Sequence, residues 1–319
     1  MKARWLGLFT LTLALSLIFG TASFSQGESQ ETVSPSSQDE DAMRAASPQA
    51  RNVELVGQIS GQVFAVAVQG NYAYVGIGPR LVILNVGNPA RPAFVGQTAM
   101  LPDIVAGIAV KGNRVYVAAR ESGLHVINIA NPARPSEISH YDTPGIAHSV
   151  MVTGSYAYVA DHEAGLRIID VSNPASLQEV GAYDTPGHAR DVAVAANLAY
   201  VADGRSGLHI INVSNPARLS ETGHYTTTGY AGGVQVAGCG SVTCTYAYVA
   251  DYEGGLRIIN VSNPAHPTET GQYTTTGYAH DVALSSGPRS RPTYAYIADG
   301  FGGLCILDVS DPRNPRWVN

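Results

Sequence analysis

Charged residues are scarce in this chain. Asp, Glu, Lys and Arg make up 14% of its 319 residues, against about 25% in an average soluble protein. The net charge is −6 and no basic cluster occurs anywhere. Because nucleic acids and anionic membrane surfaces attract clustered Lys and Arg, we expect neither as a partner.

The motifs of common enzyme classes are also missing. The sequence has no G-x-S-x-G turn, no P-loop and no HExxH segment. Its two tryptophans, Trp5 and Trp317, are not followed by Asp, so the Trp-Asp dipeptide of WD40 repeats is absent. No sequence motif of these kinds therefore points to a catalytic activity.

What the chain does have is a repeat. Residues 156–174 read YAYVADHEAGLRIIDVSNP, and similar stretches occur six times, with the second tyrosine at Tyr74, Tyr116, Tyr158, Tyr200, Tyr248 and Tyr296. The spacing is 42 residues three times and then 48 twice. A fixed period in this range is typical of repeat architectures, in which each unit buries its apolar faces against its neighbours.

Each repeat contains four short runs that are rich in Val, Ile and Tyr and are separated by Gly, Pro, Asn and Ser. These runs predict strands, and the connections are too short for crossover helices, so neighbouring strands should be antiparallel. The third run is apolar on both faces, as at Ile168 and Ile169, and must be covered on both sides. Four-stranded sheets packed face to face around an axis make a β-propeller.

Proline follows Asn or Asp after the third run of every repeat. These pairs should end the strand with a turn in which the Asn or Asp side chain bonds its own backbone. The third runs themselves read LVILNV, LHVINI, LRIIDV, LHIINV, LRIINV and LCILDV. Together with YAYVAD and the SNP turn, they resemble the LVIVD repeat family of exported and cell-surface proteins of bacteria and archaea. The resemblance implies a propeller fold and a surface location, and it supplies no catalytic motif.

The start of the chain predicts export. Lys2 and Arg4 precede an apolar run over residues 5–18, which small residues follow, so we interpret residues 1–25 as a signal peptide. The run is shorter than the roughly 20 residues of a membrane span, and the mature chain should have no transmembrane segment. Residues 26–50 are polar and predict a disordered linker. The expected location is secreted or at the cell surface, with the periplasm as an alternative.

Residues 51–319 should then form one propeller of six four-stranded blades. Residues 53–60 match the fourth strand of the other units, so we expect them to pair with the C-terminal blade and close the ring. Residues 316–319 also begin a fourth strand and would compete for that place. Seven blades with a missing piece is therefore the alternative.

Candidate binding residues gather at two positions of the repeat, which a meander brings to one rim. The turn before the first strand carries His148, Arg190 and His280, followed by Asp191 and Asp281, and the second strand ends at Asp161, Asp203, Asp251 and Asp299. The repeated aspartates most simply cap turns. As ligands they would suit Ca²⁺, but no loop has DxDxD spacing, and we predict no cofactor. His148 and His280 should lie too far apart to share Zn²⁺.

Two further features are local. Tyr230 and Tyr278 follow turns between blades and could form an aromatic platform or pack over the seam. Cys239 and Cys244 flank a lengthened hairpin and could form a disulfide, whereas Cys305 should be a buried, inert thiol. We predict a monomeric, non-catalytic propeller that binds a protein or polysaccharide at one rim. The alternatives are a metal-dependent hydrolase or lactonase-like enzyme at the channel mouth, and a structural envelope module.

Overall fold

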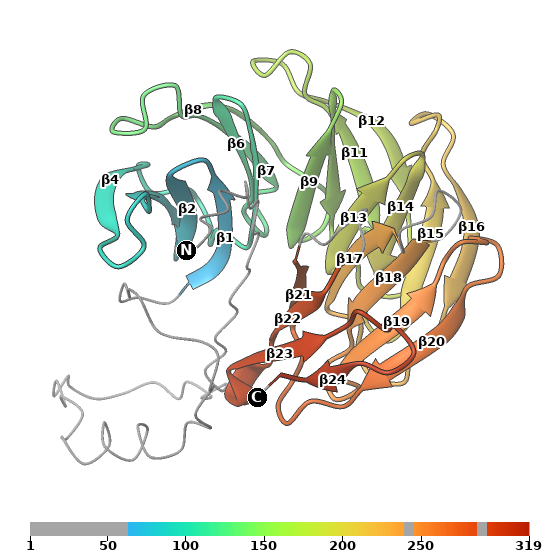
Figure 1. Cartoon of the computed structure of the whole chain (residues 1–319). Coiled ribbons are helices and arrows are strands. Elements are labelled where there is room, and N and C mark those ends of the chain that lie inside the picture. Colours follow the sequence, from blue (N-terminus) through green and yellow to red (C-terminus); the bar gives the residue numbers. More distant parts are fainter. Residues whose placement is uncertain (1–62, 239–244, 286–291, 319) are drawn as a thin grey trace, which may run out of the picture.

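The computed structural model describes residues 63–238, 245–285 and 292–318. These residues form six four-stranded antiparallel sheets in a ring, which is a six-bladed β-propeller (Figure 1). The first three blades comprise β1 (Val63–Gln69), β2 (Tyr72–Ile77), β3 (Arg80–Asn85), β4 (Ala93–Gln97); β5 (Gly107–Lys111), β6 (Arg114–Ala118), β7 (Leu124–Asn128), β8 (Ser136–Tyr141); β9 (Ser149–Thr153), β10 (Tyr156–Ala160), β11 (Leu166–Asp170) and β12 (Gln178–Tyr183).

The remaining blades follow the same order along the chain, and one short 3-10 helix precedes the last long strand. They comprise β13 (Asp191–Ala195), β14 (Leu198–Ala202), β15 (Leu208–Asn212), β16 (Ser220–Tyr225); β17 (Gly233–Gly238), β18 (Thr245–Ala250), β19 (Leu256–Asn260), β20 (Thr268–Tyr273); β21 (Asp281–Leu284), β22 (Tyr294–Ala298), η2 (Gly300–Gly302), β23 (Leu304–Asp308) and β24 (Arg316–Trp317). The predicted fold class and blade number are confirmed.

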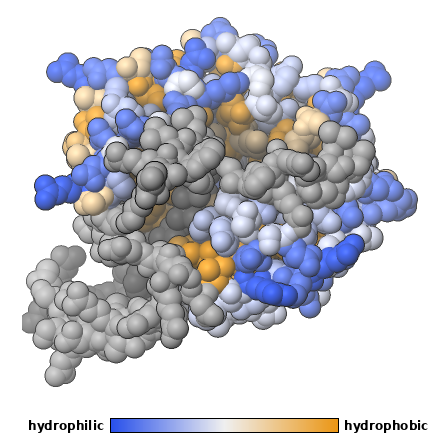
Figure 2. All heavy atoms as spheres, in the orientation of Figure 1, coloured by the Kyte–Doolittle hydropathy of each residue, from blue (hydrophilic) through white to orange (hydrophobic). Residues whose placement is uncertain are grey.

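The core lies between blades rather than within them. Ile168 of β11 packs with residues of blade 4, such as Val201, whereas its neighbour Ile169 packs with residues of blade 2. Successive residues of a strand point to opposite faces, so the apolar third strand is buried on both sides as expected. The first strands of successive blades contact one another around the axis, from β1 through β21. Hydrophilic side chains protrude around the periphery of the face seen in Figure 2.

The turn after each third strand has the expected chemistry. In blade 3 the Asn173 side-chain oxygen accepts a hydrogen bond from the Ala175 backbone N–H at 3.2 Å. Asn131, Asn215 and Asp311 make the equivalent bond at 3.1 Å. A side chain that bonds its own backbone two residues ahead fixes a turn that has the proline at its centre. This local device reverses the chain into the fourth strand of each blade.

The sixth blade differs from the others at its outer edge. Its fourth strand is β24, in which Trp317 and Arg316 pair with Leu307 and Asp308. The Asp311 turn returns the chain to this edge as in other blades, so β24 holds the place that we had assigned to residues 53–60. Those residues lie outside the described ranges. Leu304 is 38% exposed, whereas its counterparts in the other blades are fully buried.

Several expectations concern residues that the structure does not describe. They are the signal peptide at residues 1–25, the linker at residues 26–50, and the disulfide between Cys239 and Cys244. Among residues 63–238, 245–285 and 292–318, no helix has the length and apolar character needed to cross a membrane.

Candidate functional site

The first strands of the blades surround a central channel with a cavity of about 520 Å³. Three of the predicted residues, His148, Arg190 and His280, line it at one end. Each is fixed by a backbone hydrogen bond from its N–H to the last residue of the second strand of its blade, at 2.8–2.9 Å. The repeat therefore places one side chain per blade at the same height, and the sequence of each blade decides which chemistry stands there.

A second set of side chains reaches this end of the channel from the loop after each second strand. The residue at this loop position is Arg120, His162 or Tyr252 in three blades, and Gly78, Gly204 or Gly300 in the other three. All six have positive φ, between 47° and 60°. This conformation suits glycine and costs roughly 1–2 kcal/mol for a residue with a side chain. Three blades accept that strain and hold a large polar or aromatic group over the channel.

Backbone pairing connects the two sets. Arg120, His162, Gly204 and Tyr252 form isolated antiparallel bridges with Ala147, Ala189, Ala231 and Ala279. Each alanine belongs to the next blade and directly precedes His148, Arg190, Gly232 or His280. The bridges thus bring the loop residue of one blade beside the first-strand residue of the next. His188, Tyr230 and Tyr278 lie two residues before this first-strand position in blades 4, 5 and 6. We call the two sets together with these three residues the channel mouth: Arg120, His148, His162, His188, Arg190, Tyr230, Tyr252, Tyr278 and His280.

The rings of the channel mouth form two contacting groups. On one side His162 stacks on His188 with centroids 4.3 Å apart and an interplanar angle of 8°, and His148 lies 5.2 Å from His162. On the other side Tyr252 contacts Tyr230 at 5.0 Å and the edge of His280 at 4.5 Å. Tyr278 lies 6.4 Å from Tyr252 and is 42% exposed. Tyr230 and Tyr278 therefore both contact Tyr252, and the two roles expected for them, a platform for a ligand or packing over the seam, both stay open.

Arg190 connects the two groups. Its Nη1 lies 3.3 Å from Nε2 of His148, and its guanidinium carbon lies 5.9 Å from the centre of the Tyr230 ring. A guanidinium only donates hydrogen bonds, so His148 accepts at Nε2 and carries its proton on Nδ1. Among the described residues, neither Arg190 nor Arg120 forms a salt bridge. The mouth therefore presents two positive charges without a carboxylate partner.

The imidazoles of His148, His162 and His280 are neutral. Burial, together with the nearby positive charge of Arg190, lowers the pKa of His148 to about 3. Burial also lowers the pKa of His162 and of His280, and the Arg190 charge acts in the same direction on both. Two groups of neutral rings beside two arginines form a surface suited to stacking and to anionic groups.

Asp191 lies one residue further into the channel and connects three blades. Its Oδ1 accepts hydrogen bonds from the Ser149 hydroxyl at 2.6 Å and from the Val192 N–H at 2.9 Å. Its Oδ2 accepts from the Val234 N–H at 2.8 Å. Burial raises its pKa, and these three donors oppose that shift. Asp191 is therefore both a channel residue and a structural connection between blades 3, 4 and 5.

Asp281 occupies the equivalent position in blade 6. Burial raises its pKa well above the usual range, and the nearby Asp191 charge raises it further. Its carboxylate accepts the Val282 N–H at 2.7 Å. A Cβ on Gly233 in the intervening blade would come within 2.6 Å of Asp281 Oδ1, so glycine there makes room for it. Of the two carboxyl groups, Asp281 keeps its proton to the higher pH.

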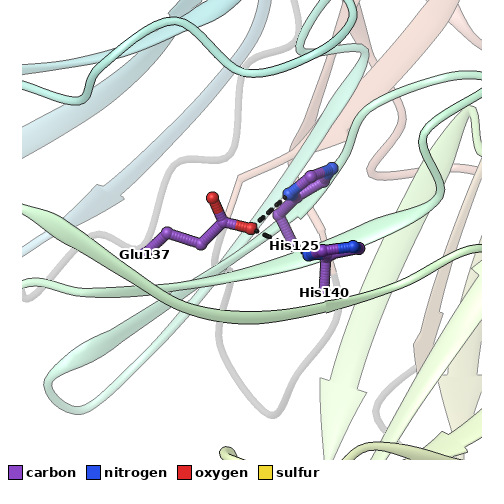
Figure 3. A group of neighbouring side chains, drawn as sticks. All are labelled: His125, Glu137 and His140. Atoms are coloured by element: carbon purple, nitrogen blue, oxygen red, sulfur yellow. Dashed lines mark hydrogen bonds and ion pairs between the residues drawn. The ribbon is translucent and has the colours of Figure 1, made fainter.

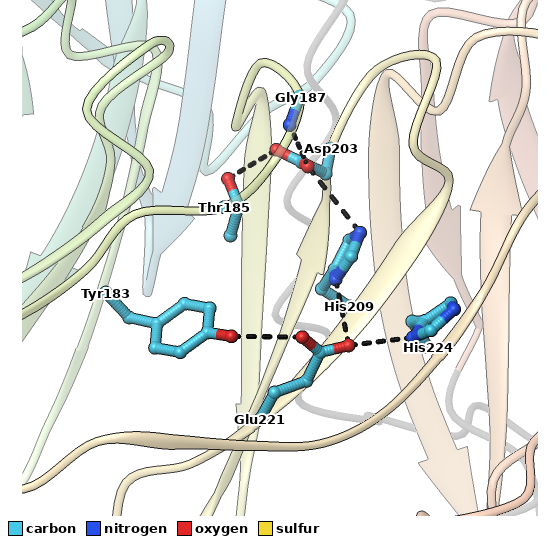
Figure 4. Close-up of polar contacts among 7 residues, drawn as sticks. All are labelled: Tyr183, Thr185, Gly187, Asp203, His209, Glu221 and His224. Carbon is cyan, nitrogen blue, oxygen red and sulfur yellow. Dashed lines mark hydrogen bonds and ion pairs between the residues drawn. The ribbon is translucent and has the colours of Figure 1, made fainter.

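The four repeated aspartates lie beneath the surface rather than in the channel. Asp161, Asp203, Asp251 and Asp299 are at most 1% exposed. Asp203 accepts hydrogen bonds from the Thr185 hydroxyl at 2.5 Å and from the Gly187 N–H at 2.7 Å (Figure 4). Asp161 makes the same pair of bonds, and Asp251 and Asp299 accept from Gly229 and Gly277 at 2.9 Å. Each aspartate holds the turn that enters its own blade, 16 to 22 residues earlier in the chain, and not the loop that it opens, which is the turn that we expected it to cap.

Four residues of the channel mouth escaped the sequence analysis, namely Arg120, His162, His188 and Tyr252. A comparison of the repeats at the loop position could have found three of them, since glycine there alternates with Arg, His and Tyr. Three donors at the mouth could hold a metal: one ligand atom each from His162, Glu163 and His188 lies within 4.8 Å of the others. Nδ1 of His162 is buried without a hydrogen-bond partner, which fits a ligand to a metal ion.

Cys305 lies on β23 and is half-buried with a free thiol. Burial, together with the nearby Asp299 charge, raises its pKa to about 12. At neutral pH the thiol is protonated, and a protonated thiol is a weak nucleophile. This agrees with the expectation of an inert cysteine, although the side chain is less buried than we expected.

Comparison with known proteins connects the repeat to a family. The profile described as the LVIVD repeat matches residues 60–99, 104–143, 144–185, 186–227, 228–275 and 276–319. No curated protein matches the sequence. The family assignment therefore rests on the match to the repeat profile.

Solved structures resemble the chain in fold. A functionally unknown protein from Desulfotomaculum acetoxidans has a TM-score of 0.63 at 12% identity, over 82% of this chain and 86% of that one. The β-propeller domain of Cps50 (Swd1) from Myceliophteria thermophila gives 0.63 at 11%, with the same coverage. A putative 6-phosphogluconolactonase from Bacteroides fragilis gives 0.62 at 13%, over 75% and 77%. At sequence identities this low, the similarity shows a shared propeller fold and nothing about a shared function.

Proposed function

This chain belongs to the LVIVD repeat family, and from that premise we propose that it is an exported or cell-surface propeller that binds an acidic polysaccharide at its channel mouth. The observation that carries the proposal is the strained loop position. Arg120, His162 and Tyr252 each hold a left-handed backbone conformation that the other three blades relieve with glycine. Strain that recurs around one opening is typical of a functional site.

The chemistry of the mouth favours anionic sugars. Tyrosine and neutral histidine rings offer apolar faces that stack on sugar rings, while Arg190 and Arg120 supply positive charge for carboxylates. Arginine pairs with carboxylates through paired N–H donors. The polar linker and the signal peptide expected from the sequence would place this mouth outside the cell, where such polymers occur.

The repeat itself supplies clean test variants. Tyr252→Gly and His162→Gly copy the glycine of blades 4 and 6, so they should relieve strain and leave the fold intact while removing a ring from the mouth. The full chain should bind polygalacturonate, more weakly as salt rises, and should not bind neutral dextran. Both glycine variants should bind polygalacturonate at least ten-fold more weakly.

Poly-glutamate serves as the protein-like probe. Binding of poly-glutamate without binding of polygalacturonate would point to an acidic protein segment as the partner. Equal polygalacturonate binding by wild type and both glycine variants would move the site away from the mouth.

A second candidate is a metal-dependent hydrolase with lactonase-like activity. The observation that favours it is the donor set of His162, Glu163 and His188 above two carboxyl groups, Asp191 and Asp281, that face the channel. When bound, a metal there would polarise a carbonyl oxygen. The similarity to a putative 6-phosphogluconolactonase is weak support, since it is a similarity of fold. Hydrolysis of a sugar lactone that needs Zn²⁺ and is lost in His188→Ala would favour this candidate.

A further inference from the structure

Away from the channel, two blades carry a histidine, a glutamate and a second histidine at equivalent positions of their outer two strands. In blade 2 these are His125, Glu137 and His140, and in blade 4 they are His209, Glu221 and His224. In each blade, one ligand atom from every member lies within 4.8 Å of the others. We propose that each trio binds a divalent transition metal of the Zn²⁺ class.

The strand register explains how the three side chains of blade 2 reach one face. His125 of β7 pairs directly with His140 of β8. Glu137 lies three residues before His140, and in a regular strand it would point to the opposite face. A bulge at Ile138 shifts the register, so Glu137 pairs with Ile127 instead. The extra residue turns Glu137 onto the face that the histidines share.

Both imidazoles converge on a single carboxylate oxygen (Figure 3). Nδ1 of His125 lies 2.8 Å from Oε1 of Glu137, and Nδ1 of His140 lies 3.3 Å from the same atom. In blade 4 the corresponding distances are 3.2 Å for His209 and 2.9 Å for His224 (Figure 4). Zinc bonds of about 2.0–2.1 Å in a tetrahedron place ligand atoms about 3.3 Å apart. The donor spacing thus already approaches that of a coordination site.

Hydrogen bonding fixes which nitrogen of His125 faces the glutamate. The Ser122 hydroxyl oxygen lies 3.0 Å from Nε2 of His125 and 2.7 Å from the Ala119 carbonyl oxygen, so it holds the far side of the ring. Nδ1 of His125 therefore faces the carboxylate of Glu137 at 2.8 Å. This is the orientation that a metal ion bound between the two side chains would use.

The second site has an outer carboxylate of the kind that orients metal-bound histidines. Nε2 of His209 lies 3.6 Å from Oδ2 of the buried Asp203, while Nδ1 faces Glu221. A histidine that binds a metal commonly directs its other nitrogen to a carboxylate. The Tyr183 hydroxyl from blade 3 donates to Oε2 of Glu221 at 3.0 Å, which leaves Oε1 for the shared position.

Blades 3 and 5 carry other residues at the positions of the two histidines. In blade 3 the residue equivalent to His125 is Arg167, whose guanidinium lies 3.6 Å from Glu179, and in blade 5 Arg257 lies 3.6 Å from Glu269. These blades carry Ala182 and Gln272 at the position of the second histidine. In blades 3 and 5 a fixed positive charge therefore accompanies the glutamate in place of the histidine pair. A metal ion would supply that charge in blades 2 and 4.

Solvent reaches both sites. His140 is 56% exposed and His224 is 60% exposed, whereas His125 and His209 are buried beneath them. Two nitrogens and one oxygen are donors that zinc prefers, and a water molecule or a partner's side chain can complete the coordination. The first trio lies on blade 2, away from His162, Glu163 and His188. The second trio lies on the outer strands β15 and β16 of blade 4, and neither trio shares a residue with that group.

The test counts metal in the purified full chain after EDTA treatment and equilibration with buffered Zn²⁺. His140→Ala and His224→Ala should each lose one equivalent of bound Zn²⁺ relative to wild type, and the double variant should lose two. His266→Ala, which removes an exposed histidine outside the trios, should lose none. The double substitution His125→Arg with His140→Ala copies blade 3, so it should keep the fold and lose one equivalent.

Co²⁺ supplies an independent readout. Wild type loaded with Co²⁺ should show visible ligand-field bands that the His140→Ala/His224→Ala variant lacks. Equal Zn²⁺ content in wild type and that double variant would overturn the proposal and leave each trio as a hydrogen-bonded group of two histidines and a glutamate. Loss of zinc in His266→Ala would overturn it too. Because the mouth residues are unchanged in these variants, their result is separate from the test of polysaccharide binding.

Discussion

Replacing Asp161 by alanine tests whether the repeated aspartates stabilise turns or bind a ligand. The Asp161 carboxylate accepts hydrogen bonds from the Thr143 hydroxyl at 2.6 Å and from the Gly145 N–H at 2.8 Å, and the side chain is fully buried. In Asp161→Ala the buried Thr143 hydroxyl and the half-buried Gly145 N–H both lose their acceptor. An unsatisfied buried donor costs about 1–3 kcal/mol, which gives about 2–6 kcal/mol for the pair.

Part of that loss is offset. Burial raises the pKa of Asp161, which means that the buried charge itself opposes folding, and its removal recovers some free energy. We therefore expect Asp161→Ala to lower the free energy of unfolding by about 2–4 kcal/mol. With an m-value of about 3 kcal/mol/M in urea, the midpoint of unfolding should fall by about 1 M.

Two control variants sharpen the urea experiment. Asp161→Asn keeps one oxygen for Gly145, and the Thr143 hydroxyl can turn to accept from the new amide, so this variant should lose less than half as much. Glu163→Ala, on the exposed surface of the same loop, should stay within about 0.5 kcal/mol of wild type. A wild-type midpoint for Asp161→Ala, together with lost polygalacturonate binding, would refute the turn role and make Asp161 a ligand-binding residue.

Three further predictions concern protonation. His148 has a folded-state pKa of about 3 and an ordinary pKa near 6.5 when unfolded, so below pH 6.5 the unfolded chain binds a proton that the folded chain does not. The free energy of unfolding should therefore fall by roughly 1.4 kcal/mol for each pH unit below 6.5. His148→Gln should make this dependence on pH shallower, as measured by urea unfolding between pH 6.5 and 5. An unchanged slope would show that His148 is charged in the fold. Asp281 has the opposite sign, because its raised pKa removes stability as the pH rises from about 4. Asp281→Asn should thus raise the unfolding midpoint at pH 7 and change it little near pH 4, whereas a loss at pH 7 would mean that the carboxylate is ionised and bonded. The Cys305 thiol, with a pKa of about 12, should react with a disulfide reagent at pH 8 far more slowly in the native chain than in urea, and equal rates would contradict its protonated state.

The channel mouth shows where sequence reasoning stops. The repeat placed His148, Arg190 and His280 at one level of the channel, because equivalent strand positions must face the same way. It did not reveal that Tyr252 meets His280, since the two residues belong to different blades and touch only through a bridge between a loop and the next strand. Nor did it reveal that Asp161 points inward, because an aspartate at a loop can cap a turn or face solvent.

The sequence by itself determined the blades of this protein. A repeating YAYVAD strand, an apolar strand after it and an Asn-Pro stop are local signals, and each acts through backbone geometry within a few residues. Tertiary structure alone decided which side chains meet. The bulge at Ile138 turns Glu137 onto the face of His125, and the ring brings Arg190 beside His148. These side-chain contacts depend on strand register and on packing between blades, which cannot be read from the residue type at any single position.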